Sequence, residues 1–196
     1  ESLSLRRPYT IHLCVDVSGS MLGENIRIAK RALSLLTESL LPGDRVSLTT
    51  FSTSGRKVFG TMEFSENSEF IRNAFSSLRA TGSTNMIAGL NIAYREAQDN
   101  YDPSTINRVI LFSDGEANVG DTDIDSFADL TRINNQEGIY LSGVGVGSSY
   151  AIERMDGLAD AGKGAHVFLP NTEEADVIIG GMERKLLEVA ADKVSV

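Results

Sequence analysis

The sequence predicts a domain of the α/β class, in which a mostly parallel six-stranded sheet is flanked by helices. Short apolar, β-branched segments alternate along the chain with longer segments whose apolar residues recur at helical spacing. The 196 residues, of which 41% are hydrophobic and 23% charged, suit one folded domain. We therefore expect residues 1–196 to form a single domain, excised from a longer protein because the chain opens on Glu1 and not on Met.

Each predicted strand is a short apolar run bounded by turn residues. The run at residues 9–15 is apolar almost throughout, which is typical of a strand buried on both faces of a parallel sheet. Because the strands alternate with helices, we expect right-handed crossover connections. The predicted strands are residues 9–15, 46–51, 57–64, 108–112, 139–146 and 166–169.

The predicted helices are recognised by apolar residues three and four positions apart. Pro42 and Gly43 end the first of them, and Asn171 with Glu174 resembles a capping box at the start of the last. The predicted helices cover residues 26–40, 70–78, 87–97, 124–134, 152–159 and 171–189.

The charge balance excludes several classes of partner. The chain has 27 Asp and Glu residues against 18 Lys and Arg, a net charge of −9. Nucleic acids and anionic membrane surfaces are bound by clustered cations, so we expect neither as a partner. No apolar run approaches the roughly 18 residues of a membrane span, so direct membrane insertion is not expected. The single Cys14 excludes an internal disulfide framework and a Cys-rich zinc module.

Oxygen-bearing side chains follow two of the buried strands. In open α/β sheets, ligands bind outside the carboxyl ends of the strands. Asp16, Ser18 and Ser20 alternate after the first strand, and Gly19 permits the tight turn that directs their oxygens to one point. Asp114 follows the fourth strand, and Thr84 lies in a polar turn that opens a helix. Carboxylates and hydroxyls are hard ligands, which suit magnesium, calcium or manganese.

The pattern Asp16-x-Ser18-x-Ser20, followed by Thr84 and Asp114, resembles the von Willebrand factor type A domain with its metal-ion-dependent adhesion site. The resemblance extends over residues 9–189 and includes residues 42–46, 82–85 and 107–115. It is closest to bacterial members related to inter-alpha-trypsin-inhibitor-type domains. It implies a Rossmann-like, doubly wound fold. It also implies a bound Mg²⁺, with Ca²⁺ or Mn²⁺ as alternatives.

The resemblance further implies a role for each residue. Ser18 and Ser20 would bind the metal directly, Thr84 would do so in the ligand-competent state, and Asp16 and Asp114 would act directly or through water. An Asp or Glu carboxylate of a protein partner would take the remaining position. The domain would then be an adhesion or assembly module and not an enzyme, monomeric in isolation. Adhesion-type domains act mostly outside the cytoplasm, which favours the periplasm, the cell surface or secretion.

Three other interpretations of the same residues remain open. The metal would serve an intrachain structural role if a neighbouring domain of the same protein capped it. An aspartyl-phosphate phosphatase also begins with an acid after its first strand, but Ser18 stands where a second acid is needed. Finally, Asp16, Ser18 and Ser20 are all common helix N-caps and would in that case only start the next helix.

Several further motifs favour structural interpretations. In integrin-type relatives, acids after the serines build a second metal site. Here Met21 and Leu22 stand there and would either form an apolar rim or tuck under the loop. The glycines at 143, 145 and 147 do not have the G-x-G-x-x-G spacing of a dinucleotide-binding loop. They predict instead that a neighbouring segment packs closely at a strand end. His12 and Cys14 are expected to be core residues.

Residues 109–131 contain six acids and no Lys or Arg. Such a run is typical of a solvated loop and a helix N-terminus. The alternative is an acidic wall beside the metal or an accessory calcium site. The acids are Asp114, Glu116, Asp121, Asp123, Asp125 and Asp129.

Overall fold

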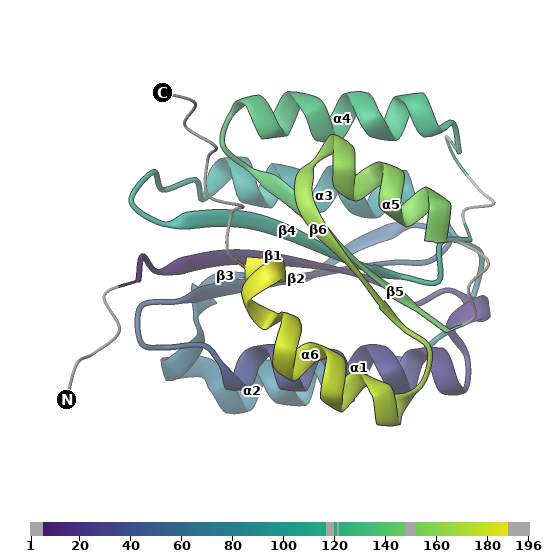
Figure 1. The fold of residues 1–196 in the computed structure, drawn as a ribbon, viewed down its shortest axis with the longest axis horizontal. Coiled ribbons are helices and arrows are strands. Elements are labelled where there is room, and N and C mark those ends of the chain that lie inside the picture. Colours follow the sequence, from purple (N-terminus) through teal and green to yellow (C-terminus); the bar gives the residue numbers. More distant parts are fainter. Residues whose placement is uncertain (1–5, 117–119, 121, 148–151, 188–196) are drawn as a thin grey trace.

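Six strands form one sheet in the order β3-β2-β1-β4-β5-β6 (Figure 1). The structure, a computed structural model, describes residues 6–116, 120, 122–147 and 152–187. Strand β3 is antiparallel to β2, and every other neighbouring pair is parallel. The predicted mostly parallel six-stranded sheet is therefore confirmed. The strands are β1 (Tyr9–Asp16), β2 (Arg45–Phe51), β3 (Gly55–Glu63), β4 (Ile106–Ser113), β5 (Tyr140–Val146) and β6 (Lys163–Leu169).

Helices cover both faces of the sheet (Figure 1). One face is covered by α1 (Glu24–Glu38), α2 (Phe64–Ser76) and α6 (Thr172–Leu187). The other is covered by α3 (Met86–Asp99), α4 (Ile124–Gln136) and α5 (Ile152–Ala161). A short 3-10 turn, η1 (Gly19–Met21), lies between β1 and α1. Asn171 caps the start of α6 and pairs with Glu174, as predicted: Glu174 N donates to Asn171 Oδ1 at 2.8 Å. The return contact joins the two side chains, from Asn171 Nδ2 to Glu174 Oε1 at 3.2 Å, instead of reaching the backbone N–H of Asn171.

Helix α2 begins earlier than the sequence predicts. The apolar periodicity starts at Phe70, whereas the helix starts at Phe64. Phe64 is buried in the core, but residues 65–69 are all polar, so the first turns carry no helical pattern of apolar residues. Asn67 also departs from helical geometry, with φ −122° and ψ 16°. The spacing of apolar residues in the sequence therefore predicts only the second half of this helix.

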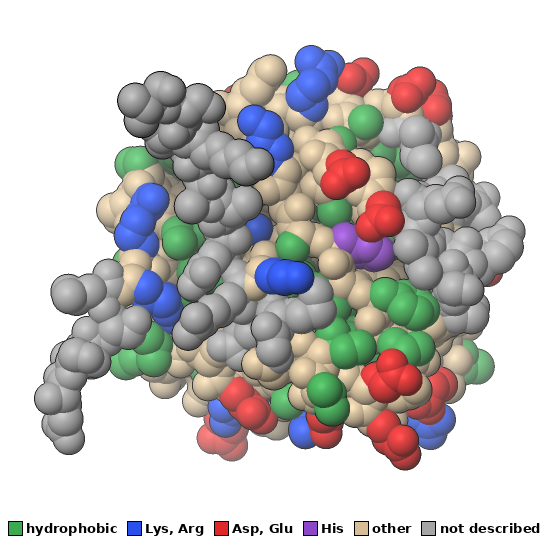
Figure 2. Space-filling model, viewed as in Figure 1, with side chains coloured by type: hydrophobic (Ala, Val, Ile, Leu, Met, Phe, Trp, Pro, Cys, Tyr) green, Lys and Arg blue, Asp and Glu red, His purple; other side chains and the backbone are tan. Residues whose placement is uncertain are grey.

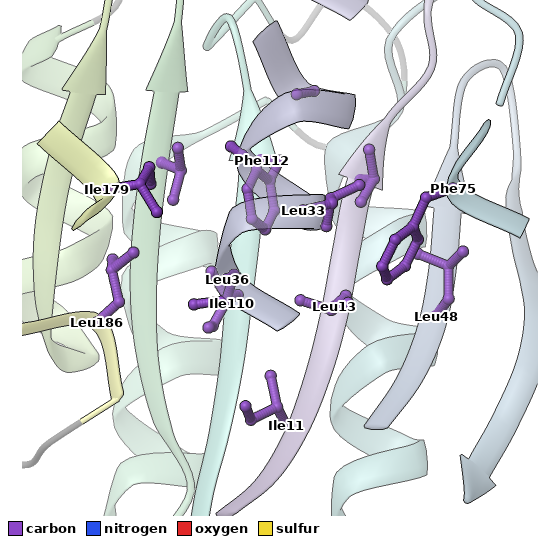
Figure 3. Close-up of a cluster of buried hydrophobic side chains, with 14 of the residues drawn as sticks. Ile11, Leu13, Leu33, Leu36, Leu48, Phe75, Ile110, Phe112, Ile179 and Leu186 are labelled. Carbon is purple, nitrogen blue, oxygen red and sulfur yellow. The ribbon is translucent and has the colours of Figure 1, made fainter. Parts of the chain in front are cut away.

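The core lies in two layers, one on each side of the sheet. Figure 3 shows the layer under α1, α2 and α6, where Leu33 of α1 lies near Phe112 of β4 and Phe75 of α2 lies near Leu48 of β2. All eight residues of β1 are buried. Val15 of β1 pairs with Phe112. This packing sets the carboxyl ends of β1 and β4 side by side, so the loops that follow them meet.

The glycines of β5 accommodate neighbouring side chains. A Cβ at Gly143 would lie 3.2 Å from Met155 Cε, and one at Gly145 would lie 3.3 Å from His166 Nε2. His166 is in turn fixed by Asp156 of α5, with 2.5 Å between Nδ1 and Oδ1. The predicted close packing of the glycine run is thus confirmed at Gly143 and Gly145.

His12 and Cys14 are core residues, as predicted, because neither is exposed to solvent. His12 Nδ1 lies 2.8 Å from Ser47 Oγ on the neighbouring strand. None of the helices that the structure describes is both long enough and apolar enough to span a membrane.

Replacing Gly89 with Ala is expected to destabilise the fold by about 2 kcal/mol. Gly89 lets α3 lie directly on Phe51 of β2, and a Cβ there would be 2.7 Å from Phe51 Cβ. This clash outweighs the roughly 1 kcal/mol that alanine gains over glycine in a helix. Urea denaturation measures the loss. The control is Gly180→Ala on α6, where no atom of the described residues lies within 4 Å of the added Cβ; equal stabilities for the two variants would contradict the prediction.

Candidate metal centre

The centre is built around the carboxylate of Asp16, the last residue of β1. Asp16 is fully buried, and its Oδ1 accepts hydrogen bonds from Ser18 N at 2.9 Å and from Ser18 Oγ at 2.6 Å. Its Oδ2 accepts a hydrogen bond from Ser113 Oγ at 2.8 Å. Ser18 Oγ lies 3.1 Å from Ser20 Oγ. The predicted alternation therefore brings the oxygens of Asp16, Ser18 and Ser20 into one hydrogen-bonded group.

These three side chains do not cap the following helix. Helix α1 has Gly23 at its N-cap, and no side chain there accepts a capping hydrogen bond. Ser18 precedes the turn η1, also without a side-chain capping hydrogen bond. The capping interpretation is therefore wrong, and the oxygens point toward each other.

The electrostatics of Asp16 favour a cation. Burial raises the pKa of Asp16 to about 6, and the nearby charge of Asp114 also raises it. The hydrogen bonds from Ser18 and Ser113 lower the pKa but only partly offset these effects. Among the residues that the structure describes, Asp16 forms no ion pair with Lys, Arg or His. A buried carboxylate without a positive partner is costly. A divalent cation would supply that missing charge.

The turn that carries Thr84 is fastened to the Asp16 loop. Thr81 N donates to Val17 O at 2.8 Å, and Gly19 N donates to Gly82 O at 2.8 Å. Gly82 has a φ of +80°, and a Cβ there would lie 2.8 Å from Thr53 Oγ1, so only glycine suits this position. Thr84 itself is buried, two residues beyond this contact.

Asp114 lies directly beyond β4, the neighbour of β1. Its Oδ1 accepts a hydrogen bond from Glu116 N at 3.1 Å, and its side chain is half-buried. Its effect on the pKa of Asp16 reflects how near the two carboxylates are. The structure therefore gathers at one edge of the sheet the three loops that carry Asp16, Ser18, Ser20, Thr84 and Asp114. Metal binding by these residues stays a prediction.

Two supporting residues were not predicted from the sequence. Ser113 donates to Asp16 and accepts a hydrogen bond from Gly115 N at 2.9 Å, so it couples the two acidic loops. Asn25 Nδ2 donates to Ser20 O at 3.2 Å and holds the far side of the Asp16 loop. In the sequence, the role of Ser113 was indicated only by its position, as a polar residue at the end of a buried strand and next to Asp114.

The residues after Ser20 divide between the two predicted alternatives. Met21 is fully buried in the core, whereas Leu22 is 72% exposed. Met21 thus tucks under the loop, and Leu22 forms an apolar rim beside the candidate centre.

The acidic run behaves mainly as a helix start. Asp123 accepts a hydrogen bond from Asp125 N at the start of α4, and Asp129 pairs with Arg132 at 2.7 Å. Asp121 lies outside the described residues. Figure 2 shows acidic and basic side chains interspersed over the face in view.

The donor set distinguishes this centre from a transition-metal site. Within the described ranges, no group of three or more His, Cys, Asp or Glu side chains is placed to hold a metal ion. The candidate centre instead offers two carboxylates together with hydroxyls, which are the hard ligands of Mg²⁺ and Ca²⁺. The residues present therefore fit a hard divalent cation.

Residues 10–179 match the model of the von Willebrand factor type A domain. The chain belongs to this family. It is 34% identical over 181 residues to the uncharacterized protein YfbK of Escherichia coli, covering 91% of this chain and 31% of YfbK. It is 26% identical over 170 residues to inter-alpha-trypsin inhibitor heavy chain H4 of Bos taurus, covering 82% of this chain and 19% of the heavy chain. The chain thus spans less than a third of these relatives.

A solved structure shares the fold. Proximal thread matrix protein 1 from the mussel byssus, in a form with a zinc-occupied metal-ion-dependent adhesion motif, superposes with a TM-score of 0.74 at 19% identity, over 90% of this chain and 45% of that one. The resemblance to von Willebrand type A and inter-alpha-trypsin-inhibitor domains, and the doubly wound fold that it implies, are therefore confirmed. Von Willebrand type A domains are often metal-dependent and take part in protein interactions.

Proposed function

We propose that this von Willebrand type A domain is a protein-binding module whose Mg²⁺ bridges to an Asp or Glu carboxylate of a partner protein. The observation that carries the proposal is the buried Asp16 carboxylate, hydrogen-bonded into a hydroxyl-rich loop without a cationic partner among the described residues. The metal would be held by Asp16, Ser18, Ser20, Thr84 and Asp114. The zinc-occupied motif of the mussel protein supports a divalent ion at this edge of the fold.

The chemistry of the site supports recognition over catalysis. A divalent ion bound mainly by neutral hydroxyls keeps much of its positive charge and attracts an incoming carboxylate. Asp16 is fully buried, and both of its oxygens accept hydrogen bonds. This environment suits a carboxylate that orients the loop. It does not suit the nucleophile of a phosphatase, which must reach a substrate. The exposed Leu22 would offer an apolar contact beside the bound carboxylate.

An intrachain role is the second candidate. The chain covers only 31% of YfbK, so that relative carries further segments, and in this second candidate a corresponding segment would cap the metal. If the longer protein bound no carboxylate ligand while the isolated domain did, the intrachain role would be favoured. As part of the proposed protein-binding function, we also propose that the isolated domain is monomeric and acts outside the cytoplasm.

Adding Mg²⁺ should stabilise the domain against heat, and EDTA should reverse the effect. At a metal concentration ten times the dissociation constant, the gain is about 1.4 kcal/mol. For a chain of this size that corresponds to a rise of roughly 3–6 °C in Tm. Differential scanning calorimetry measures it, with NaCl of matched ionic strength as the control. An unchanged Tm at millimolar Mg²⁺ would contradict the metal site.

Partner binding provides the second test of the proposal. A partner protein, once captured, should dissociate in EDTA and be displaced by a soluble carboxylate such as acetate. Binding that persists in EDTA would exclude the metal bridge.

A further inference from the structure

We propose that the cavity between α1 and α2 is a second ligand site, which binds an organic carboxylate such as the side chain of a Glu or Asp in a partner peptide. The cavity has a volume of about 270 Å³ and is lined by Lys30, Ser34, Arg72, Phe75 and Ser76. Lys30 and Ser34 lie one turn apart on α1, and the other three come from the last turns of α2. Two helices therefore supply cations and hydroxyls to one concave space.

The cations at this cavity lack acidic partners. Lys30 Nζ and Arg79 Nη1 both donate to the carbonyl oxygen of Ser76, at 3.0 Å and 3.3 Å. Burial, and then the charge of Arg79, lower the pKa of Lys30, which shows how closely the positive charges are gathered. In the described part of the chain, neither of them nor Arg72 forms an ion pair.

This gathering is unusual in so acidic a chain. The net charge is −9, and other cations of α1 are paired, Arg27 with Glu24 at 2.8 Å and Arg31 with Asp176 at 2.6 Å. An anion drawn to the cavity would meet Lys30 and Arg72, neither of which forms an ion pair within the described residues, with the charge of Arg79 nearby. Charge complementarity therefore identifies the ligand as an anion.

A purely structural role explains only part of the arrangement. Lys30 and Arg79 bind carbonyls at the end of α2, as cations at helix C-termini commonly do. Arg72 has no such role, because its guanidinium donates to no acceptor among the described residues and only lies 5.6 Å from the Phe64 ring centroid. Its fork of donors is available to pair with a carboxylate.

The walls of the cavity favour a carboxylate on a carbon stem over an inorganic anion. The core residue Phe75 lines the cavity together with Lys30 and Arg72, whose charged groups stand on aliphatic stems. A Glu side chain matches this pattern, since its methylene groups would contact carbon and its carboxylate would meet the cations. Inorganic phosphate would leave the apolar walls without a partner.

The test is a titration of the ¹⁵N-labelled domain with N-acetyl-L-glutamyl-N-methylamide, followed by NMR at low salt after divalent metals have been removed on a chelating resin. Working without metal and without a soluble carboxylate chelator separates this site from the proposed metal, so that either proposal can fail alone. We expect saturable shifts of the amides of residues 30–34 and 72–76. We also expect at least about tenfold weaker binding of the uncharged glutamine analogue and of inorganic phosphate.

Matched variants complete the test. Arg72→Gln should weaken binding about fivefold or more. It should lower Tm by only about 1–4 °C, because among the described residues the Arg72 side chain makes no hydrogen bond and its cation–π contact with Phe64 is weak. Lys30→Gln should weaken binding similarly, and Arg132→Gln on the opposite face should bind as the wild type does. The proposal is overturned by the absence of saturable shifts, by equal binding of the glutamine analogue, by tighter binding of phosphate, or by wild-type affinity in Arg72→Gln.

Discussion

Replacing Asp16 with Asn should abolish the stabilisation of the domain by Mg²⁺ and, at the same time, make the metal-free domain more stable. The wild type should gain about 2.7 kcal/mol when the metal is present at one hundred times its dissociation constant. The variant should gain nothing, because the amide removes a negative charge and a hard oxygen from the centre.

The metal-free gain has a separate physical cause. Asp16 is fully buried, and burial is the largest influence on its pKa, so its ionised form destabilises the fold when no cation is present. Asn is nearly the same shape, and its Oδ1 can still accept from Ser18 while its Nδ2 donates to Ser113. Relief of the buried charge is expected to stabilise the metal-free domain by about 2 kcal/mol.

Urea denaturation at pH 7.5, in EDTA and in Mg²⁺, measures both effects. Asp129→Asn is the matched control, because this exposed acid pairs with Arg132 on α4, away from the candidate centre. The control should keep the full response to Mg²⁺. An Asp16→Asn variant that Mg²⁺ still stabilises, or one that unfolds more readily than the wild type in EDTA, would be incompatible with this account of the centre.

The strands and most helices follow from local patterns of burial. Strand β1 is apolar in sequence because both of its faces are covered, and all of its residues are buried. Helix α2 shows the limit of such patterns, because the residues between Phe64, which is buried, and Phe70 are all polar and give no apolar periodicity. The sheet order β3-β2-β1-β4-β5-β6 is also absent from local patterns, since it depends on which strands pair across the chain.

The candidate centre was predictable where its residues are near in sequence or recognisable as a family motif. Asp16, Ser18 and Ser20 form a local turn, and their contacts repeat the alternation in the sequence. Ser113 was not predictable, because its hydrogen bond to Asp16 requires β4 to lie beside β1. Asn25 likewise acts only because α1 starts close to the Asp16 loop.

The domain is expected to lose about 3 kcal/mol of unfolding free energy between pH 7 and pH 4 through His12 alone. Burial lowers the pKa of His12 from 6.5 to about 4, with the charge of Glu96 opposing this and that of Arg45 adding to it. Nε2 is buried and has no hydrogen-bond partner among the described residues. A proton on the folded ring would therefore be poorly stabilised.

The sign follows from which state binds the proton. As the pH falls below 6.5, the unfolded chain protonates His12 while the folded domain does not, so protons favour unfolding. The stability is fully present above pH 6.5 and is lost progressively as the pH falls to about 4. Below that value both states carry the proton, and this contribution stops changing.

His12→Asn should remove this part of the pH dependence, because Asn places an amide near Nδ1, within reach of Ser47, and does not titrate. Urea denaturation at steps between pH 7.5 and pH 4 compares the slopes. Cys14→Ala on the same strand is the control, because it leaves a cavity in the core without removing a group that titrates in this range. Asp16 is present in all three proteins, so its titration cancels in the comparison. The two proteins differ only in the His12 ring, which burial keeps neutral. If the unfolding free energy of His12→Asn fell with pH in parallel with that of the wild type, the acid sensitivity would therefore belong to other groups.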